Sequence, residues 1–142
     1  MNSARQVTFV DPREQPAWDA QVAGLPGAGV FHGAAWARCL CETYEFKPCY
    51  AVIRDGRALL AAQPVMEVHH MPGRVRGVAL PFSDACPAVA RDARDRAVLV
   101  AAIQQEALLR GWRRVEFRGP VHDAGAAVSA RYRVHEVVLG IS

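Results

Sequence analysis

The chain has 142 residues, of which 51% are hydrophobic and 22% charged, and this is the size and composition of one folded globular domain. Its longest apolar runs, such as AVLVAAI, are far shorter than the roughly 20 residues of a membrane span, and no charged-then-apolar leader opens the sequence, so we expect a cytoplasmic protein without a membrane span. The net charge of +3 comes from basic residues scattered along the chain, without the aromatic-interleaved basic stripe that favours nucleic acids, so DNA is not an expected partner.

The first third of the chain predicts one strand and two helices. The β-rich run VTFVD predicts a strand over residues 7–11. Trp18 and Val22 lie four residues apart and predict a short amphipathic helix over residues 14–24. In FHGAAWARCLCETY, residues 31–44, the apolar residues repeat every four positions, which indicates a second helix packed on a flat surface.

Three strands are predicted next. PCYAVIRD, residues 48–55, predicts a strand that leads into the pair Asp55-Gly56, a strong hairpin signal. RALLAAQPVMEVHH, residues 57–70, then predicts one long returning strand. Pro64 lies within that strand and has no backbone N–H to donate, so it predicts an edge position or a bulge. After the turn MPG, RVRGVALPF predicts a third strand over residues 74–82.

The strongest helix signal covers residues 93–110, because Asp92 is a suitable N-cap, the apolar residues form a broad face and Gly111 ends the pattern. WRRVEFRG then predicts a short strand. Residues 120–130 read as a loop or weak helical turn, and RYRVHEVVLGIS predicts a final strand over residues 131–142.

The order of these elements determines the fold class. Antiparallel strands followed by a strand-helix-strand crossover require a mixed sheet with helices against it. We therefore expect a single domain over residues 1–142 of the α/β (α+β) class, with a mixed, mainly antiparallel sheet flanked by helices. This layout resembles the first half and middle of the GNAT N-acyltransferase fold.

The sequence gives no metal-binding or disulfide pattern. The cysteines, at positions 39, 41, 49 and 86, form no C-x-x-C pair and are expected to be buried free thiols, which fit a reducing compartment. His69 and His70 are adjacent, so in a strand they face opposite sides of the sheet. No metal site is expected.

Four motifs carry a resemblance to a family. They are a Phe-His plus Trp helix in FHGAAWARCLCETY, Tyr-x-x-x-Pro-x-Tyr in YEFKPCY, Leu-Pro-Phe-x-Asp in LPFSDACP, and Glu-x-Arg in WRRVEFRG. In this order and at similar spacing, they resemble the N-terminal half of the FemAB-related transferases. The resemblance covers residues from about 15 to 142, nearly the whole chain.

The resemblance implies a function. FemAB-related proteins consist of two GNAT-like domains, and they transfer an acyl or aminoacyl group to an amine, as in building the peptide cross-bridge of bacterial cell walls. This chain corresponds to the first domain only, so the resemblance implies that it contributes to acceptor binding and needs a second domain or subunit for catalysis. The implied donor is acetyl-CoA or aminoacyl-tRNA, and the implied acceptor is a small molecule or a peptidoglycan or polysaccharide precursor.

The segment LPFSDACP is the leading candidate for a substrate site. Pro81 interrupts the strand ladder and frees backbone groups, and Ser83 and Asp84 follow at the carboxyl end of the strand, where sites in α/β sheets usually lie. The resemblance places this segment, with Phe82, near the substrate cleft. Asp84 is our candidate general base for an amine acceptor. Alternatively, Ser83 and Asp84 only cap a turn.

Four further residues are candidates for substrate binding, each with a structural alternative. His32 could contact a substrate near the start of its helix or serve as a capping or packing group. Trp36 belongs to the same helix and is equally suited to the core. Glu116 and Arg118 are two apart, share one strand face, and could instead pair with each other or with helix residues.

The spacing Arg74-x-x-Gly77-x-Ala79 matches the way acetyltransferases hold a pyrophosphate. Such a loop works because backbone N–H groups, exposed by glycine and backed by a helix N-terminus, face the anion. Here Gly77 leads into a strand, and the segment that leads into the long helix has no glycine and carries Asp84 and Asp92, whose charges oppose a phosphate. The alternative for this spacing is a turn between strands, and we assign no cofactor-binding residue.

Three functions therefore stay open. The first is the acceptor-binding transferase domain already described. The second is a non-catalytic interaction module derived from that fold, which would be a homodimer formed through the apolar strand predicted at residues 131–142, since an uncovered sheet edge invites pairing. The third is a self-sufficient acetyltransferase with an unorthodox coenzyme A loop.

Overall fold

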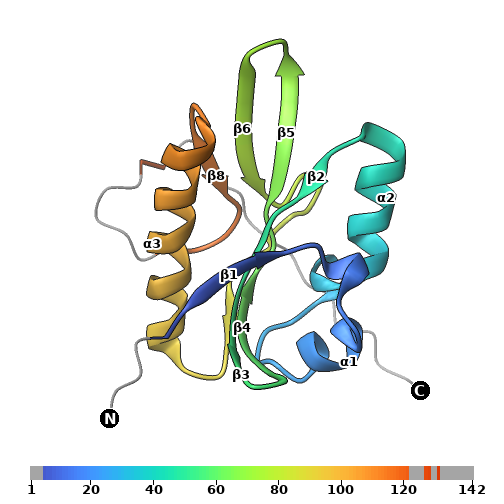
Figure 1. Ribbon diagram of the computed structural model, residues 1–142, viewed down its shortest axis with the longest axis vertical. Coiled ribbons are helices and arrows are strands. Elements are labelled where there is room, and N and C mark those ends of the chain that lie inside the picture. Colours follow the sequence, from blue (N-terminus) through green and yellow to red (C-terminus); the bar gives the residue numbers. More distant parts are fainter. Residues whose placement is uncertain (1–4, 122–126, 129–130, 132–142) are drawn as a thin grey trace, which may run out of the picture.

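Two four-stranded sheets form the centre of the protein, as the computed structural model in Figure 1 shows; it describes residues 5–121, 127–128 and 131. Their strands are β1 (Val7–Val10), β2 (Lys47–Pro48), β3 (Tyr50–Asp55), β4 (Ala58–Gln63), β5 (Met66–Met71), β6 (Arg74–Ala79), β7 (Val89–Ala90) and β8 (Val115–Phe117). One sheet has the order β1-β3-β4-β7 and the other the order β2-β5-β6-β8.

The helices cover both faces of this central layer. They are α1 (Trp18–Ala23), α2 (Ala34–Tyr44) and α3 (Ala93–Arg110), with short 3-10 turns η1 (Pro12–Glu14) and η2 (Val30–His32). In Figure 1, α3 lies on one side of the strands, and α1 and α2 lie on the other. This mixed α+β architecture, mainly antiparallel and flanked by helices, is the predicted fold class.

Residues of β3 alternate between two hydrophobic cores because successive side chains of a strand point to opposite faces. Tyr50 and Val52 are buried in the core under α1 and α2, whereas Ala51 and Ile53 are buried in the core under α3. The sheet is therefore covered on both faces, which explains why the strand reads as a continuous apolar run.

The predicted long strand over residues 57–70 was wrong, because Pro64 divides it. β4 ends at Gln63 and pairs with β3, while β5 begins at Met66 and pairs with β6 in the other sheet. Proline cannot donate a ladder hydrogen bond. The strand before the hairpin divides at the same level, into β2 and β3, and there the N–H of Cys49 donates to the Val65 carbonyl at 2.8 Å.

Two other boundaries differ from the prediction. The helix predicted over residues 14–24 begins only at Trp18, because Pro16 and the left-handed backbone of Ala17, with φ of 56°, separate it from η1. The segment predicted as a loop after residue 82 contains β7, which pairs with β4. The expected strand over residues 131–142, Arg131 apart, lies outside the described residues.

The predicted strand-helix-strand crossover is confirmed. β6 and β8 run parallel, with Gly77 opposite Val115 and Ala79 opposite Phe117, and α3 lies between them in sequence. α3 has the predicted bounds, with the Asp92 side chain accepting from the N–H of Arg94. In the described part of the chain, no helix has the length and apolarity to cross a membrane.

The expectation of buried cysteines holds for two of the four. Cys49 and Cys86 are buried, and burial raises the pKa of their thiols to about 11 and about 12. Cys41 is half-buried, and Cys39 is exposed because α2 turns its other face, with Ala37 and Leu40, to the core. All four thiols are free.

Candidate functional site

The turn that follows β6 is built by Pro81 and Ser83. Pro81 has no N–H, so the ladder stops at Ala79. The buried Ser83 hydroxyl donates to the Leu80 carbonyl at 2.7 Å and closes the turn. Ser83 therefore caps the turn, one of the two roles considered for it, and its hydroxyl proton is committed to that bond.

Phe82 stands out from this turn into solvent. Its backbone has φ of 56°, a left-handed conformation that costs a bulky residue about 1–3 kcal/mol, and its side chain is 57% exposed. The ring stacks on Tyr44 at the end of α2, with 4.8 Å between centroids. Asp84, the candidate general base, lies exposed two residues beyond.

Tyr44 also stacks on Phe46, with 5.3 Å between centroids, so three aromatic rings lie side by side. We call Tyr44, Phe46 and Phe82 the aromatic platform. An open hollow of about 340 Å³ adjoins it, lined by Tyr44, Glu45, Phe46, Lys47 and His69. Tyr44 and Phe46 are not among the predicted site residues, although both belong to the Tyr-x-x-x-Pro-x-Tyr motif.

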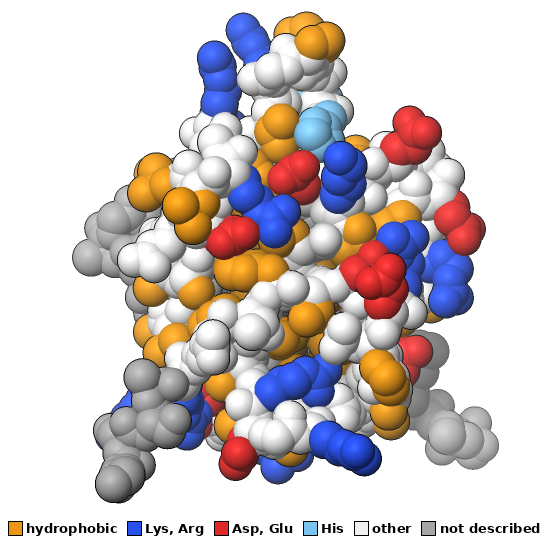
Figure 2. Space-filling model, viewed as in Figure 1, with side chains coloured by type: hydrophobic (Ala, Val, Ile, Leu, Met, Phe, Trp, Pro, Cys, Tyr) orange, Lys and Arg blue, Asp and Glu red, His pale blue; other side chains and the backbone are white. Residues whose placement is uncertain are grey.

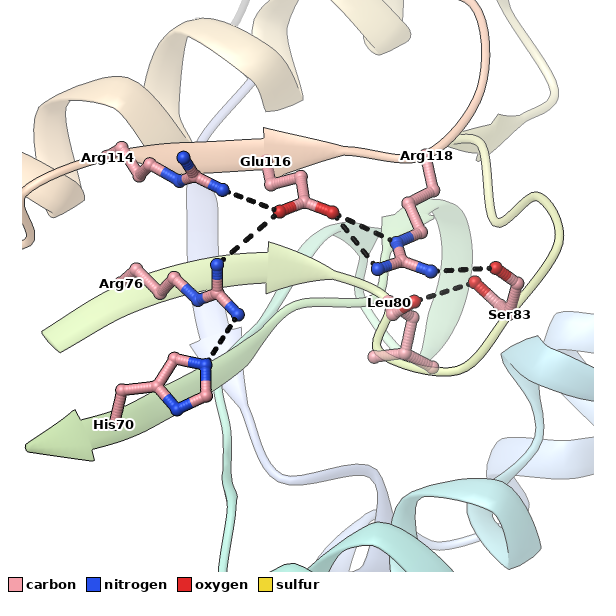
Figure 3. Close-up of polar contacts among 7 residues, drawn as sticks. All are labelled: His70, Arg76, Leu80, Ser83, Arg114, Glu116 and Arg118. Atoms are coloured by element: carbon pink, nitrogen blue, oxygen red, sulfur yellow. Dashed lines mark hydrogen bonds and ion pairs between the residues drawn. The ribbon is translucent and has the colours of Figure 1, made fainter. Parts of the chain in front are cut away.

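Glu116 on β8 lies among three arginines (Figure 3). Its Oε1 accepts from the Nε and lies 3.0 Å from the Nη2 of Arg118, and its Oε2 accepts from Arg114 at 3.2 Å. Arg76 reaches the same Oε2 from β6 at 3.8 Å. We call these four residues the arginine cluster. Glu116 and Arg118 therefore pair with each other, which was one of the two structural alternatives considered for them.

Arg118 joins the arginine cluster to the turn. Its Nη1 donates to the Ser83 carbonyl at 3.2 Å, as Figure 3 shows. Its backbone N–H donates to the Ala79 carbonyl, and its own carbonyl accepts from Cys86 at 2.8 Å. The structure thus brings together Phe82, Ser83, Glu116 and Arg118 from the predicted set, and Arg76 and Arg114 with them.

His32 and Trp36, the other predicted binding residues, have internal contacts. His32 is buried; its Nδ1 accepts from the Gly29 N–H at 3.0 Å, and its Nε2 donates to the Pro87 carbonyl at 2.9 Å. Both ring nitrogens are therefore used within the protein. Trp36 is half-buried and packs edge-on against Phe31.

The N-terminus of α3 is filled by the protein's own charges. Asp92 caps the helix, and Asp95 in the first turn is buried and forms an ion pair with Arg5. A helix N-terminus attracts anions through its free N–H groups. Here the Asp92 side chain accepts from the N–H of Arg94 and the Asp95 carboxylate is paired with Arg5, so the protein's own groups already occupy the start of this helix.

The Arg-x-x-Gly-x-Ala motif lies within β6 and not in a loop. Gly77 pairs with Val115, and a Cβ on Gly77 would lie 2.4 Å from the ring of Trp112. The alternative reading of this motif as a turn between strands was therefore also wrong. The glycine is required by the close approach of a tryptophan, and not by a phosphate.

A second hollow, of about 220 Å³, lies between the loop after α1, β7 and the first turns of α3. Its wall is mainly proline, alanine and valine, with Gln63 and Arg96 as polar members. Gln63 donates to the Cys86 carbonyl at 3.0 Å. None of the predicted site residues lines this hollow within the described part of the chain.

Charges on the visible face are mixed. Figure 2 shows basic and acidic side chains interspersed, without a continuous basic stripe on that face. Among the residues that the structure describes, no three His, Cys, Asp or Glu side chains are grouped so that they could hold a metal ion. The candidate site is made of aromatic rings, guanidinium groups and the carboxylates of Asp84 and Glu116.

No protein-family model and no curated protein matches the sequence. Solved structures do match it. A ribosomal-protein-alanine N-acetyltransferase from Brucella melitensis biovar Abortus 2308 is 14% identical, with 93% of this chain aligned to 99% of that one and a TM-score of 0.54. An aminoglycoside N-acetyltransferase in complex with CoA is 13% identical over 96% of each chain, with a TM-score of 0.54.

A third similar structure is an integron cassette protein from the mobile metagenome of Cole Harbour Salt Marsh. It is 17% identical, with 95% of this chain aligned to 91% of that one and a TM-score of 0.57. None of these names tests the finer resemblance to the FemAB-related transferases. At such low identity the likeness concerns the fold alone, and the chain has the fold of the GNAT N-acetyltransferases.

Proposed function

We propose that the chain is the acceptor-binding domain of an N-acyl or aminoacyl transferase of the FemAB type, and that a second domain or subunit brings the acyl donor. The observation that carries this proposal is the N-terminus of α3. Asp92 caps this helix and Asp95 lies in its first turn, so the described residues offer no free helix N-terminus of the kind that holds a pyrophosphate such as that of coenzyme A.

The acceptor site of this proposal is the turn between β6 and β7. The aromatic platform, which includes Phe82, offers ring faces at one side of the turn. Arg118 and Glu116 offer charged groups at the other side. Asp84 follows Ser83 in this turn and is exposed, and it is the proposed general base for the acceptor amine. The Phe82 ring, which stands in solvent at a backbone cost, is consistent with ligand binding.

A self-sufficient acetyltransferase is the second candidate. It is favoured by the extent of the fold likeness, which covers 96% of both chains for the acetyltransferase solved with CoA. It requires the donor to bind away from the α3 N-terminus. The two candidates differ in one measurable property, the affinity of the isolated chain for acetyl-CoA.

The test is a pair of titrations on the full chain. We expect isothermal titration with acetyl-CoA to show no binding at submillimolar concentration. We expect a peptidoglycan stem peptide with a free lysine amine to shift the NMR signals of Phe82, Ser83 and Arg118. The substitution Phe82→Ala should abolish these shifts, and Leu108→Ala, which trims a side chain 82% exposed on α3, should leave them unchanged.

Each result decides between the candidates. Submillimolar binding of acetyl-CoA would overturn the proposal in favour of the self-sufficient enzyme. If a folded chain bound neither acetyl-CoA nor the stem peptide, the proposal would be overturned in favour of a non-catalytic module. Shifts that survive Phe82→Ala would place the acceptor elsewhere on the molecule.

A further inference from the structure

We infer that the arginine cluster is a receptor for a phosphate monoester group on the ligand of this domain. The inference deepens the proposed function, because it rests on the acceptor lying at the turn after β6, and it adds the chemical class of the group that the acceptor carries. It is argued from the charges and contacts of Arg76, Arg114, Glu116 and Arg118.

The arginine cluster has an excess of positive charge. Three guanidinium groups surround one carboxylate, so the arginine cluster carries a net charge of +2, which is three positive charges less one. A phosphate monoester carries close to two negative charges above its second pKa of about 6. The ligand would therefore balance the charge that Glu116 leaves uncompensated, whereas a carboxylate would balance half of it.

The arginine cluster also has hydrogen-bond donors that a ligand can use. A guanidinium group has its N–H groups in a rigid fork that fits phosphate oxygens. Among the described residues, the Arg114 side chain makes a single hydrogen bond, to Glu116, and it is 62% exposed. Most of its fork therefore faces solvent, where a ligand can reach it.

Arg76 has a buried hydrogen-bond donor, its Nε–H, without a partner among the described residues. Its Nη2 donates to the Nε2 of His70 at 3.1 Å, and its Nη1 faces Glu116, as Figure 3 shows. A buried N–H without a partner is rare in native proteins. Because this N–H is shielded from solvent, a bound oxygen atom would satisfy it only if the Arg76 side chain turned toward the ligand.

The guanidinium groups of the cluster are held in place before a ligand binds. Arg118 is fixed by Glu116 on one side and by the Ser83 carbonyl on the other. Arg76 and Glu116 arise from neighbouring parallel strands, in which Val78 lies opposite Glu116. In this arrangement Glu116 is a positioning residue, which orients the guanidinium groups for the anion.

The test is a titration of the full chain with inorganic phosphate at about pH 8 and constant ionic strength, followed by NMR. We expect saturable shifts at residues 114–118 and 80–83, with a dissociation constant on the order of 1 mM, which two or three charge-assisted hydrogen bonds can supply. Acetate and chloride at the same ionic strength should give much weaker, unsaturated shifts.

Two matched substitutions test the site. Arg114→Gln should weaken phosphate binding about tenfold, the effect of losing one charge-assisted hydrogen bond. Arg113→Gln removes the same charge from the neighbouring residue, whose exposed side chain takes no part in the arginine cluster, and should change the affinity less than about twofold. Thermal melting of both variants shows whether the fold is kept.

The inference is overturned if phosphate gives no saturable shifts, if acetate binds as tightly as phosphate, or if the two substitutions weaken binding equally, as a general charge effect would. Its failure differs from that of the proposed function. Binding of the stem peptide without phosphate would reject the receptor alone, and phosphate binding sensitive to Arg114 without the peptide would reject the acceptor assignment alone.

Discussion

At the residue scale, Gly77 shows how a motif can match a spacing and serve another purpose. The ring of Trp112, which follows α3, lies where a side chain on Gly77 would be. Trp112 is 7% exposed and belongs to the core under α3. The absence of a side chain at residue 77 therefore allows the end of α3 to approach β6.

We expect Gly77→Ala to destabilise the protein by about 1–3 kcal/mol, the usual cost of overpacking a core. Urea unfolding measures this free energy. Gly29→Ala is the matched control, because a Cβ there meets nothing within 4 Å, and it should cost little.

A double-mutant cycle identifies the cause of the loss. In a Trp112→Ala background, Gly77→Ala should cost far less, since the ring that it meets is gone. If the cost were the same in both backgrounds, the clash with Trp112 would not be the reason.

At the element scale, Glu67 connects β5 to the end of α3. Its Oε2 accepts from the indole N–H of Trp112 at 2.8 Å, and its Oε1 lies 2.9 Å from the Nε2 of His69. Arg110 lies 3.8 Å from the same carboxylate. Burial acts to raise the pKa of Glu67, but the hydrogen bonds from Trp112 and His69 outweigh it, so the pKa is below its ordinary value.

A lowered pKa predicts a pH-dependent contribution to stability. The folded state holds the ionised carboxylate more favourably than the unfolded state does, so the contribution is present above the ordinary value of 4.5 and is lost as pH falls through the lower, folded pKa. We expect Glu67→Gln to lower the free energy of unfolding by about 1 kcal/mol at pH 7, and this difference from wild type to shrink in acid below pH 4.5.

Urea unfolding across this pH range checks the prediction. Glu106→Gln is the control, because Glu106 pairs with Arg110 along the surface of α3, where such pairs contribute only a few tenths of a kcal/mol. A difference for Glu67→Gln that stayed constant down to acid pH would contradict the assignment.

The periodicity of apolar residues predicted the helices and strands that bury one face. It did not predict boundaries that depend on which strands pair with each other. α2, α3 and β8 follow from apolar spacing and alternation along the chain. The division at Pro64 and the two-residue β7 do not, because both depend on which strand lies alongside. For the same reason alternation predicted that Glu116 and Arg118 share a face, but it could not bring Arg76 or Tyr44 to them, since those contacts join different elements.

At the scale of the whole molecule, the remaining prediction concerns assembly. The apolar terminal strand expected over residues 131–142 predicts a homodimer formed along a sheet edge. Light scattering at micromolar concentration should give a mass of about 31 kDa, twice the 15.5 kDa of one chain. A mass of one chain would contradict the prediction.

A variant tests whether the dimer forms instead through the most exposed large apolar side chains among the described residues. Leu108 and Leu109 near the end of α3 are 82% and 83% exposed. The double substitution Leu108→Ser and Leu109→Ser should leave the dimer intact. Loss of the dimer in this variant would move the interface to α3.

The segment between β6 and β7 has no regular structure of its own, yet separate parts of the molecule hold it. Arg118 binds the Ser83 carbonyl, Gln63 binds the Cys86 carbonyl, and His32 binds the Pro87 carbonyl. A segment tied in this way has surrendered its conformational entropy during folding. A ligand that binds there would have little left to order, so more of its contact energy would appear as affinity.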